Sequence, residues 1–92
     1  MANEQVTADE IRNEVKKLVA EITEREPEEI SDTALFMDEL GIDSLMAIEM
    51  LVAMTKRYKI EISEEEFGKI KNVNEAVVMV QQHLAQRATK AE

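Results

Sequence analysis

Apolar residues near the start of the chain recur with the spacing of a helix. Thr7 and Glu10 have capping-box spacing, in which two side chains satisfy the first amide groups of a helix. The apolar positions that follow share one helical face: Ile11, Val15, Leu18, Val19 and Ile22. Because the residue before a proline is disfavoured in helical backbone, Pro27 predicts that this first helix ends near Arg25.

Residues 27–43 contain apolar side chains without a sustained period. These are Ile30, Leu35, Phe36, Leu40 and Ile42, and polar residues and Gly41 interrupt them. Connections longer than about 12–15 residues are uncommon in compact domains and are often functional. We therefore predict a long ordered loop that packs over the bundle.

The second predicted helix begins at Asp43 or Ser44, both good capping residues, and ends near Tyr58. Nine of the ten residues 45–54 are apolar. One helical face contains Ala47, Met50, Leu51, Met54 and Tyr58, and the opposite side contains Leu45, Ile48, Glu49 and Val52. We interpret the first face as core and the second as a docking surface. A helix buried on all sides is the alternative.

Two further helices follow a short segment, 59–62, that is too isolated to predict a sheet. Ser63 and Glu66 have capping spacing before a short third helix, and Asn72 and Glu75 have it before a fourth. The apolar face of the fourth helix contains Val73, Val77, Val80 and Leu84. We predict an all-α four-helix bundle with three longer helices. Residues 1–92 would form a single domain, with a core of about 6–86 and a polar, frayed tail, 87–92.

Charge and composition exclude several classes of function. A formal net charge of −9 opposes binding to nucleic acid or to an anionic membrane and favours partners with basic surfaces. The absence of cysteine excludes disulfides, thiolate metal sites and cysteine nucleophiles. The first residues, Met1–Gln5, are polar, and no apolar run approaches the roughly 20 residues that span a bilayer. We expect a cytoplasmic monomer without a signal peptide or membrane insertion.

The segment Asp38–Leu45 places the hydroxyl of Ser44 in the first turn of a helix, after a glycine, Gly41, that permits a tight turn. A helix N-terminus stabilises an exposed phosphate ester by about 0.3–1 kcal/mol. The position therefore suits a phosphorylated serine. An ordinary helix-capping residue is the alternative.

The residues Leu40-Gly41-Ile42-Asp43-Ser44-Leu45, with Glu49 five positions after the serine, resemble the phosphopantetheine attachment motif of acyl carrier proteins. The resemblance continues without a gap through Ile60–Ile62, Glu64–Glu66, Ile70 and Val73. It implies that a phosphopantetheinyl transferase moves 4'-phosphopantetheine from coenzyme A onto Ser44. Acyl intermediates of fatty-acid, polyketide or related lipid biosynthesis would be held on this arm as thioesters. The resemblance implies a carrier with no catalytic residue. Because the sequence has no cysteine and no EF-hand spacing, we also expect no metal site.

The same resemblance implies which residues meet partner enzymes. Asp43 and Glu49 would meet basic residues on the transferase and on acyl synthases and transferases. The apolar contacts to these enzymes or to the acyl chain would come from Leu45, Ile48, Val52 and Ile70.

Two departures from the family pattern alter this surface. Met46, which we include in the partner-binding set, stands where fatty-acid carriers commonly have an acidic residue. Lys56, Arg57 and Lys59 make the end of the second helix basic, where those carriers are usually acidic. We interpret the altered surface as a sign of a specialised pathway, such as polyketide synthesis.

Other interpretations remain open at this point. A peptidyl or aminoacyl carrier shares the serine, although the length and acidity of this chain favour the acyl type. A small helical adaptor would bind through the second helix without modification. We expect His83, in the last helix, to be a surface residue. A catalytic pair of His83 with Ser44 is not expected, because it would lack an orienting acid. Glu64–Glu66 are expected to be a solvated first turn, with a divalent-cation site as the weaker alternative.

Overall fold

The computed structural model describes residues 7–90, so the expectations for the polar start of the chain and for residues 91–92 lie outside it. Its elements are α1 (Ala8–Thr23), a 3₁₀ turn η1 (Pro27–Glu29), α2 (Ser44–Tyr58), α3 (Glu64–Phe67) and α4 (Val73–Lys90). The described part of the chain contains no strand. The predicted all-helical fold, with three longer helices and a short third one, is confirmed.

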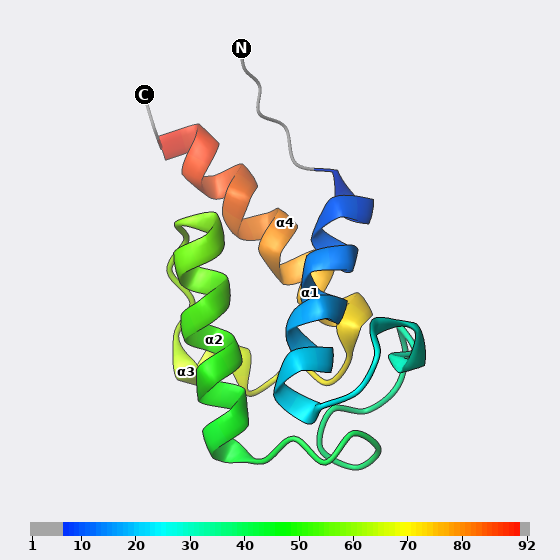
Figure 1. Cartoon of the computed structure of the whole chain (residues 1–92). Helices are drawn as coiled ribbons and strands as arrows, with labels where there is room; N and C mark the ends of the chain where they lie inside the picture. The colour runs from blue at the N-terminus through cyan, green and yellow to red at the C-terminus, as the bar shows by residue number, and fades with distance from the viewer. Residues whose placement is uncertain (1–6, 91–92) are drawn as a thin grey trace.

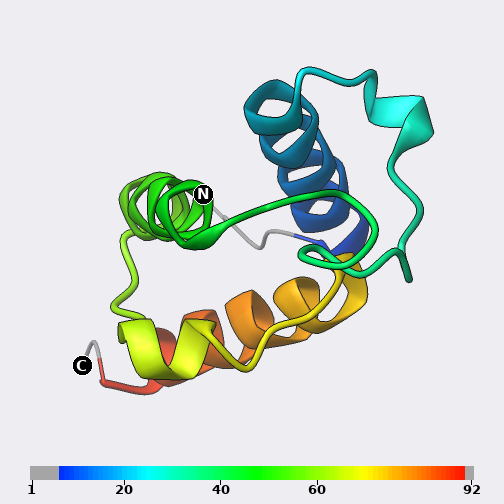
Figure 2. The same cartoon turned by 90° about the horizontal axis from the view of Figure 1, so that it is seen from below.

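The three longer helices surround one core, and α3 packs against α2 (Figure 1). α1 and α2 run in opposite directions, so α2 begins at the end of the molecule opposite to the start of α1. The view from below shows the loop between them passing the start of α4 before it reaches α2 (Figure 2). The loop therefore runs along one end of the bundle and leads to the start of α2.

The predicted cap of α1 is confirmed. The side chain of Thr7 accepts a hydrogen bond from the Glu10 amide, and the Glu10 side chain accepts one from the Thr7 amide. The helix ends at Thr23, two residues before the predicted end. The reason is that Glu24 adopts left-handed backbone, with φ of 59°, and its amide turns back to the carbonyls of the last turn.

The core is aliphatic and is built from the predicted faces. Its fully buried large side chains are Ile11, Val15, Val19, Ile30, Met50, Met54, Val73 and Val80. Four loop residues, Ile30, Phe36, Leu40 and Ile42, are buried with them, which confirms that the loop packs over the bundle. The Phe36 amide also donates to the Lys71 carbonyl at 2.8 Å, and this bond ties the loop to the segment before α4.

One prediction for the last helix is confirmed and one is wrong. The predicted Asn72 cap is present, since its side chain accepts a hydrogen bond from the Glu75 amide at 2.9 Å, and α4 extends to Lys90. His83 is not a free surface residue. Its side chain is only 16 % exposed, and Nε2 lies 2.8 Å from Glu66 Oε2 of α3. None of the described helices has the combination of length and apolar character needed to cross a membrane.

Candidate functional site

The start of α2 is fixed by Asp43. Its side chain Oδ1 accepts a hydrogen bond from the Met46 amide at 2.9 Å, and its carbonyl accepts one from the Ala47 amide at 2.9 Å. Asp43 is therefore the N-cap, and Ser44 is the first residue of the helix. Both side chains are exposed.

The exposure of Ser44 follows from the residues that precede it. Leu40 and Ile42 are buried, and the Ile42 amide donates to the Phe36 carbonyl at 2.9 Å, so the loop is held on the core up to this point. Gly41 lies between them with φ of +71°, which is left-handed backbone that a residue with a Cβ seldom adopts. No atom lies within 4 Å of where its Cβ would be, so the backbone conformation, rather than space, selects glycine.

Ser44 combines an exposed hydroxyl with a position in the first turn of a helix. The amides of the first helical turn and the positive end of the helix dipole favour a phosphate ester on its hydroxyl. His83, the single histidine of the sequence, is engaged with Glu66 on the α3–α4 side of the bundle. The arrangement can hold a phosphodiester within reach of solvent.

The outer face of α2 is apolar and exposed. Leu45 is 66 % exposed, Ile48 41 % and Val52 45 %, and Glu49 is exposed beside them. The opposite face contains the buried residues Met50, Leu51, Met54 and Tyr58, with Ala47 partly buried. The helix is therefore not buried on all sides, and the predicted division into two faces is confirmed.

Two other residues of the predicted partner-binding set are less exposed than these. Met46 and Ile70 are half-buried and pack against the core. The side chain of Met46 thus lies partly inside the fold. Ile70 lies after α3 and lines the same pocket as Ser44.

That pocket has a volume of about 280 Å³ and lies between α2, α3 and the loop. Apolar side chains dominate its lining, including Ile48 and Phe67, and Glu64 stands at its edge. It also contains Met37, which is 63 % exposed and was missed by the sequence analysis. No signal could have found Met37, because the loop has no period from which the direction of a side chain follows.

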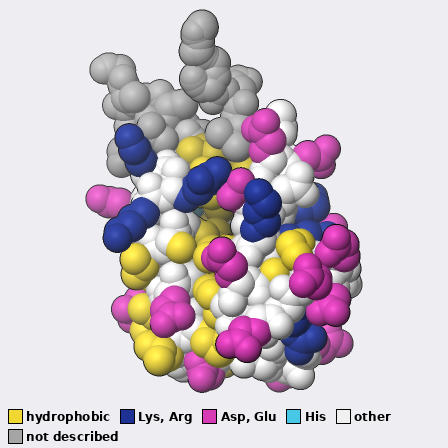
Figure 3. Space-filling view, viewed as in Figure 1, with side chains coloured by type: hydrophobic (Ala, Val, Ile, Leu, Met, Phe, Trp, Pro, Cys, Tyr) yellow, Lys and Arg dark blue, Asp and Glu magenta, His cyan; other side chains and the backbone are white. Residues whose placement is uncertain are grey.

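The far end of α2 has the opposite character. Lys56, Arg57 and Lys59 are exposed, and Arg57 pairs with Glu14 of α1 at 3.0 Å. Figure 3 shows hydrophobic side chains over the lower part of α2 and basic side chains gathered over its upper end. The helix therefore presents an apolar, acidic end beside Ser44 and a basic end away from it.

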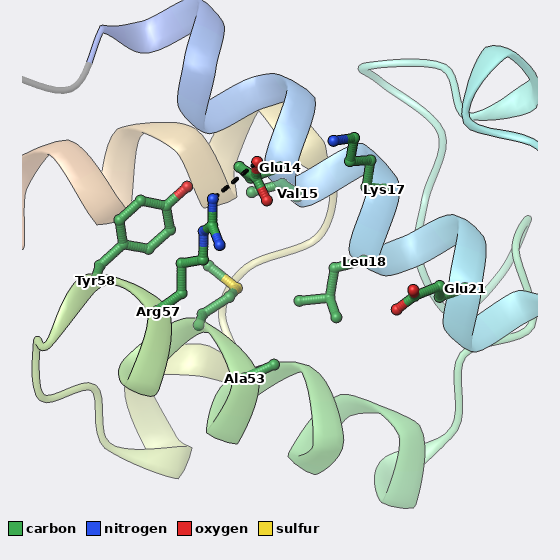
Figure 4. A pocket seen from close by; sticks show the side chains of 9 residues that line it. Glu14, Val15, Lys17, Leu18, Glu21, Ala53, Arg57 and Tyr58 are labelled. Atoms are coloured by element: carbon green, nitrogen blue, oxygen red, sulfur yellow. Dashed lines mark ion pairs between the residues drawn. The ribbon is translucent and has the colours of Figure 1, made fainter.

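A second hollow, of about 180 Å³, separates α1 from α2. Figure 4 shows Leu18 of α1 facing Ala53 of α2 across it, with the Arg57–Glu14 ion pair at one side. Burial raises the pKa of Tyr58, and the Glu14 carboxylate acts in the same direction. Ser44 does not line this hollow, so it is separate from the candidate site.

Comparison with known proteins relates this geometry to one family. Residues 13–80 match the family described as phosphopantetheine attachment site. Two curated relatives, both called acyl carrier protein, come from Brachyspira hyodysenteriae strain ATCC 49526 / WA1 and from Brachyspira hyodysenteriae. Each is 39 % identical to this chain over 72 residues, which are 77 % of this chain and 92 % of the relative.

Solved structures agree with these sequence matches. The NMR structure of the HMG-ACPI domain from the CurA module of Lyngbya majuscula superposes with a TM-score of 0.75 at 25 % identity, covering 94 % of this chain and 89 % of that one. The acyl carrier protein of Enterococcus faecalis superposes with a TM-score of 0.72 at 26 % identity, covering 84 % of this chain and 98 % of that one. The similarity extends over nearly the whole fold.

Proposed function

The chain belongs to the acyl carrier protein family, and from this premise we propose that Ser44 carries the phosphopantetheine arm. The observation that supports this most directly is the position of Ser44, which is exposed as the first residue of α2, behind the Asp43 cap. In the transfer, the serine oxygen forms a bond to the phosphorus that carries pantetheine in coenzyme A. The pyrophosphate bond breaks, adenosine 3',5'-bisphosphate leaves with the electron pair, and the hydroxyl proton of Ser44 is released.

The cofactor of this family is 4'-phosphopantetheine, and the chain carries acyl intermediates of fatty-acid or polyketide synthesis on it. Bound to the protein, the arm supplies a thiol that forms thioesters. This chain has no cysteine of its own to do so. We propose that it has no catalytic activity and acts in the cytoplasm as a monomeric, single-domain carrier. α1, α2 and α4 share one core, which supports the single domain.

We further propose that partner enzymes dock on the outer face of α2. The exposed aliphatic side chains of this face begin directly after Ser44, and Asp43 and Glu49 add negative charge. Charges at the rim of an interface mainly accelerate encounter and select partners, which suits a carrier that visits several enzymes. The proposed contact residues are Asp43, Leu45, Met46, Ile48, Glu49, Val52 and Ile70.

The pocket beside Ser44 is the proposed resting place of the acyl chain. It is apolar, it opens between α2 and α3, and Ser44 itself lines it. Ile48, Ile70 and Phe67 line it and would contact the acyl chain.

Intact-protein mass spectrometry tests the attachment site. The unmodified chain is incubated with coenzyme A, magnesium and a broad-specificity phosphopantetheinyl transferase, and the mass gain of one phosphopantetheine is measured. Ser44→Ala is expected to remain unmodified. Ser63→Ala is the matched control, because Ser63 is also an exposed serine at the start of a helix, and this variant is expected to be loaded like the parent.

Modification of Ser44→Ala, or its loss in Ser63→Ala, would place the arm elsewhere. Failure of the parent chain with two different transferases, while another carrier reacts beside it, would contradict the proposed attachment altogether.

A further inference from the structure

The basic end of α2 lies on the same face as the proposed docking residues. Leu45, Glu49, Val52 and Lys56 follow one another at intervals of three or four residues, which places them in one stripe along α2. Lys59, the C-cap residue with left-handed backbone, directly follows the helix at the same end as Lys56. The stripe is exposed over its whole length. Arg57 falls outside it and turns toward α1, where it pairs with Glu14 at 3.0 Å (Figure 4).

Lys56 and Lys59 keep their charges available to an external partner. Among the described residues, neither lysine takes part in any of the ion pairs that the structure contains, which involve Arg12, Lys16, Arg57 and His83. Lys56 lines a shallow hollow together with Glu61 and Glu66, yet neither carboxylate reaches it at ion-pair distance. On a chain with a net charge of −9, these two exposed cations make the electrostatic potential at this end of α2 locally more positive.

The distance along the helix fixes where a partner would meet this charge. Lys56 is twelve residues and Lys59 fifteen residues beyond Ser44, so with a rise of 1.5 Å per residue they lie about 18 Å and 22 Å from the attachment point. A partner that accepts the arm in its active-site tunnel therefore meets the two lysines at this distance from the tunnel mouth.

Resting on the proposed function, we propose that Lys56 and Lys59 recognise an acidic patch on the acyl-handling partner enzyme, about 18–22 Å from its tunnel mouth. The apolar and acidic end of α2 then faces an apolar and basic rim at the mouth. The lysines also repel enzymes whose basic surface continues along the whole helix, and this selects against the wrong partner. A protein surface fits better than nucleic acid or an anionic membrane, because the rest of the chain is strongly negative.

The test uses the chain loaded with a phosphopantetheine analogue whose terminal electrophile alkylates the nucleophilic cysteine of a β-ketoacyl synthase. The probe is a synthase of known structure with a basic docking surface, in two forms. One is the parent, and in the other the basic residues 18–22 Å from the tunnel mouth are replaced by Glu. The rate of cross-linking is measured for each pair at about 0.05 M and 0.5 M NaCl.

The native chain is expected to react about 10-fold faster with the Glu form than with the parent synthase, and K56E/K59E is expected to show the reverse preference. The neutral variant K56Q/K59Q should fall between them. Because the Debye length falls from above 10 Å to about 4 Å over this salt range, the preferences should shrink at high salt. The control K17E/R25E changes the net charge equally at two exposed residues, Lys17 of α1 and Arg25 just after this helix, and it should keep the native preference.

Equal rates of the native chain with both synthase forms would overturn the proposal, and so would an equal effect of K17E/R25E. Binding of the native chain to phosphatidylglycerol vesicles that K56E/K59E abolishes would also overturn it, in favour of a membrane. Mass spectrometry of the loaded chain precedes the measurement, so failure at Ser44 counts against the proposed function, whereas failure of the preference counts against this inference alone. Circular dichroism confirms that each variant is folded.

Discussion

Leu45 is the residue at which exposure and function can be separated most simply. Its side chain is 66 % exposed although it follows Ser44 directly, so the fold gains little from it. Leu45→Ala should leave the free energy of unfolding nearly unchanged but raise the KM of the phosphopantetheinyl transferase for the chain. A loss of about 1–2 kcal/mol of binding free energy at the centre of an interface corresponds to an increase in this KM of about 5- to 30-fold.

The matched control for Leu45 is Val78→Ala. Val78 is 50 % exposed on α4, away from α2, and its truncation should change neither KM nor kcat. Equal effects of the two substitutions would show that the transferase does not use the outer face of α2.

Asp32 connects three parts of the chain through charged groups. Its carboxylate lies 2.6 Å from Lys16 Nζ and 3.1 Å from Arg12 Nη1, and Arg12 also donates to the side chain of Asn74 at 2.6 Å. The hydrogen bond from Lys16 lowers the pKa of Asp32 below its ordinary value of 3.8, against the opposing effect of partial burial. The positive charges of Lys16 and Arg12 lower this pKa further.

Asp32→Asn should therefore destabilise the chain in a pH-dependent way. Because the folded-state pKa is lowered, the carboxylate stabilises the fold above its unfolded-state pKa, and this contribution is lost as the pH falls through the folded-state value. Asp32, Lys16 and Arg12 are partly exposed and screened by solvent, so we expect the free energy of unfolding of Asp32→Asn to be lower than that of the parent by about 0.5–1 kcal/mol at pH 7. This difference is the stability deficit. Urea unfolding at pH 7, 5 and 3 should show this deficit at the two higher values and a smaller one at pH 3.

Asp38→Asn is the control for Asp32, because Asp38 is an exposed carboxylate of the same loop. It should produce a smaller deficit at pH 7. A deficit of Asp32→Asn that stayed constant from pH 7 to pH 3 would mean that the carboxylate charge is not its source.

At the scale of elements, local sequence signals predicted the helices but not the contacts between them. The capping pairs at Thr7, Ser63 and Asn72 and the cap at Asp43 all mark true starts, because a cap depends only on residues a few positions apart. The outer and core faces of α2 were likewise predictable from a period of 3.6 residues. These two signals were sufficient to place Ser44 at a helix start.

What sequence could not predict depends on residues that are distant along the chain. The His83–Glu66 contact joins α4 to α3, and the Arg12–Asp32–Asn74 cluster joins α1, the loop and α4. Neither follows from the spacing of residues. The last residue of α1 could be predicted only approximately for a different reason, since a glutamate rather than a glycine adopts the left-handed backbone there.

The packing between α1 and α2 is incomplete, and the hollow of about 180 Å³ between them can be filled. Ala53 lies half-buried opposite Leu18, so Ala53→Leu should bring a larger aliphatic side chain into this space (Figure 4). Filling a cavity of this kind commonly stabilises by about 0.5–2 kcal/mol. Each kcal/mol raises the melting temperature of a domain of this size by about 4–8 °C.

Thermal unfolding followed by circular dichroism measures the effect of Ala53→Leu. Ala85→Leu, at an exposed position of α4, is the control and should change the melting temperature by much less. A fall in melting temperature for Ala53→Leu alone would show that α1 and α2 cannot accept the larger side chain without moving apart.

At the scale of the whole molecule, an excess of negative charge opposes the fold. The chain has 20 acidic and 11 basic residues, and the radius of gyration of its Cα atoms is 13.0 Å. Two like charges 12–15 Å apart repel each other by about 0.3 kcal/mol in water, and many such pairs exist at this size. The same negative charge attracts basic partner surfaces over long distances. The net charge therefore accelerates association with partners and also lowers the stability of the fold.

Added salt should therefore stabilise this carrier. Raising NaCl from about 0.01 M to 0.5 M shortens the Debye length from about 30 Å to about 4 Å, which screens the long-range repulsion more than the ion pairs in direct contact. We expect the melting temperature to rise over this range, and to rise less in Glu21→Gln/Glu28→Gln, which removes two exposed negative charges. Sucrose of equal osmolality stabilises proteins by exclusion from their surface and does not screen charge, so it should raise the melting temperatures of parent and variant by equal amounts. A fall in melting temperature with NaCl would mean that ion pairs such as Lys16–Asp32 outweigh the net repulsion.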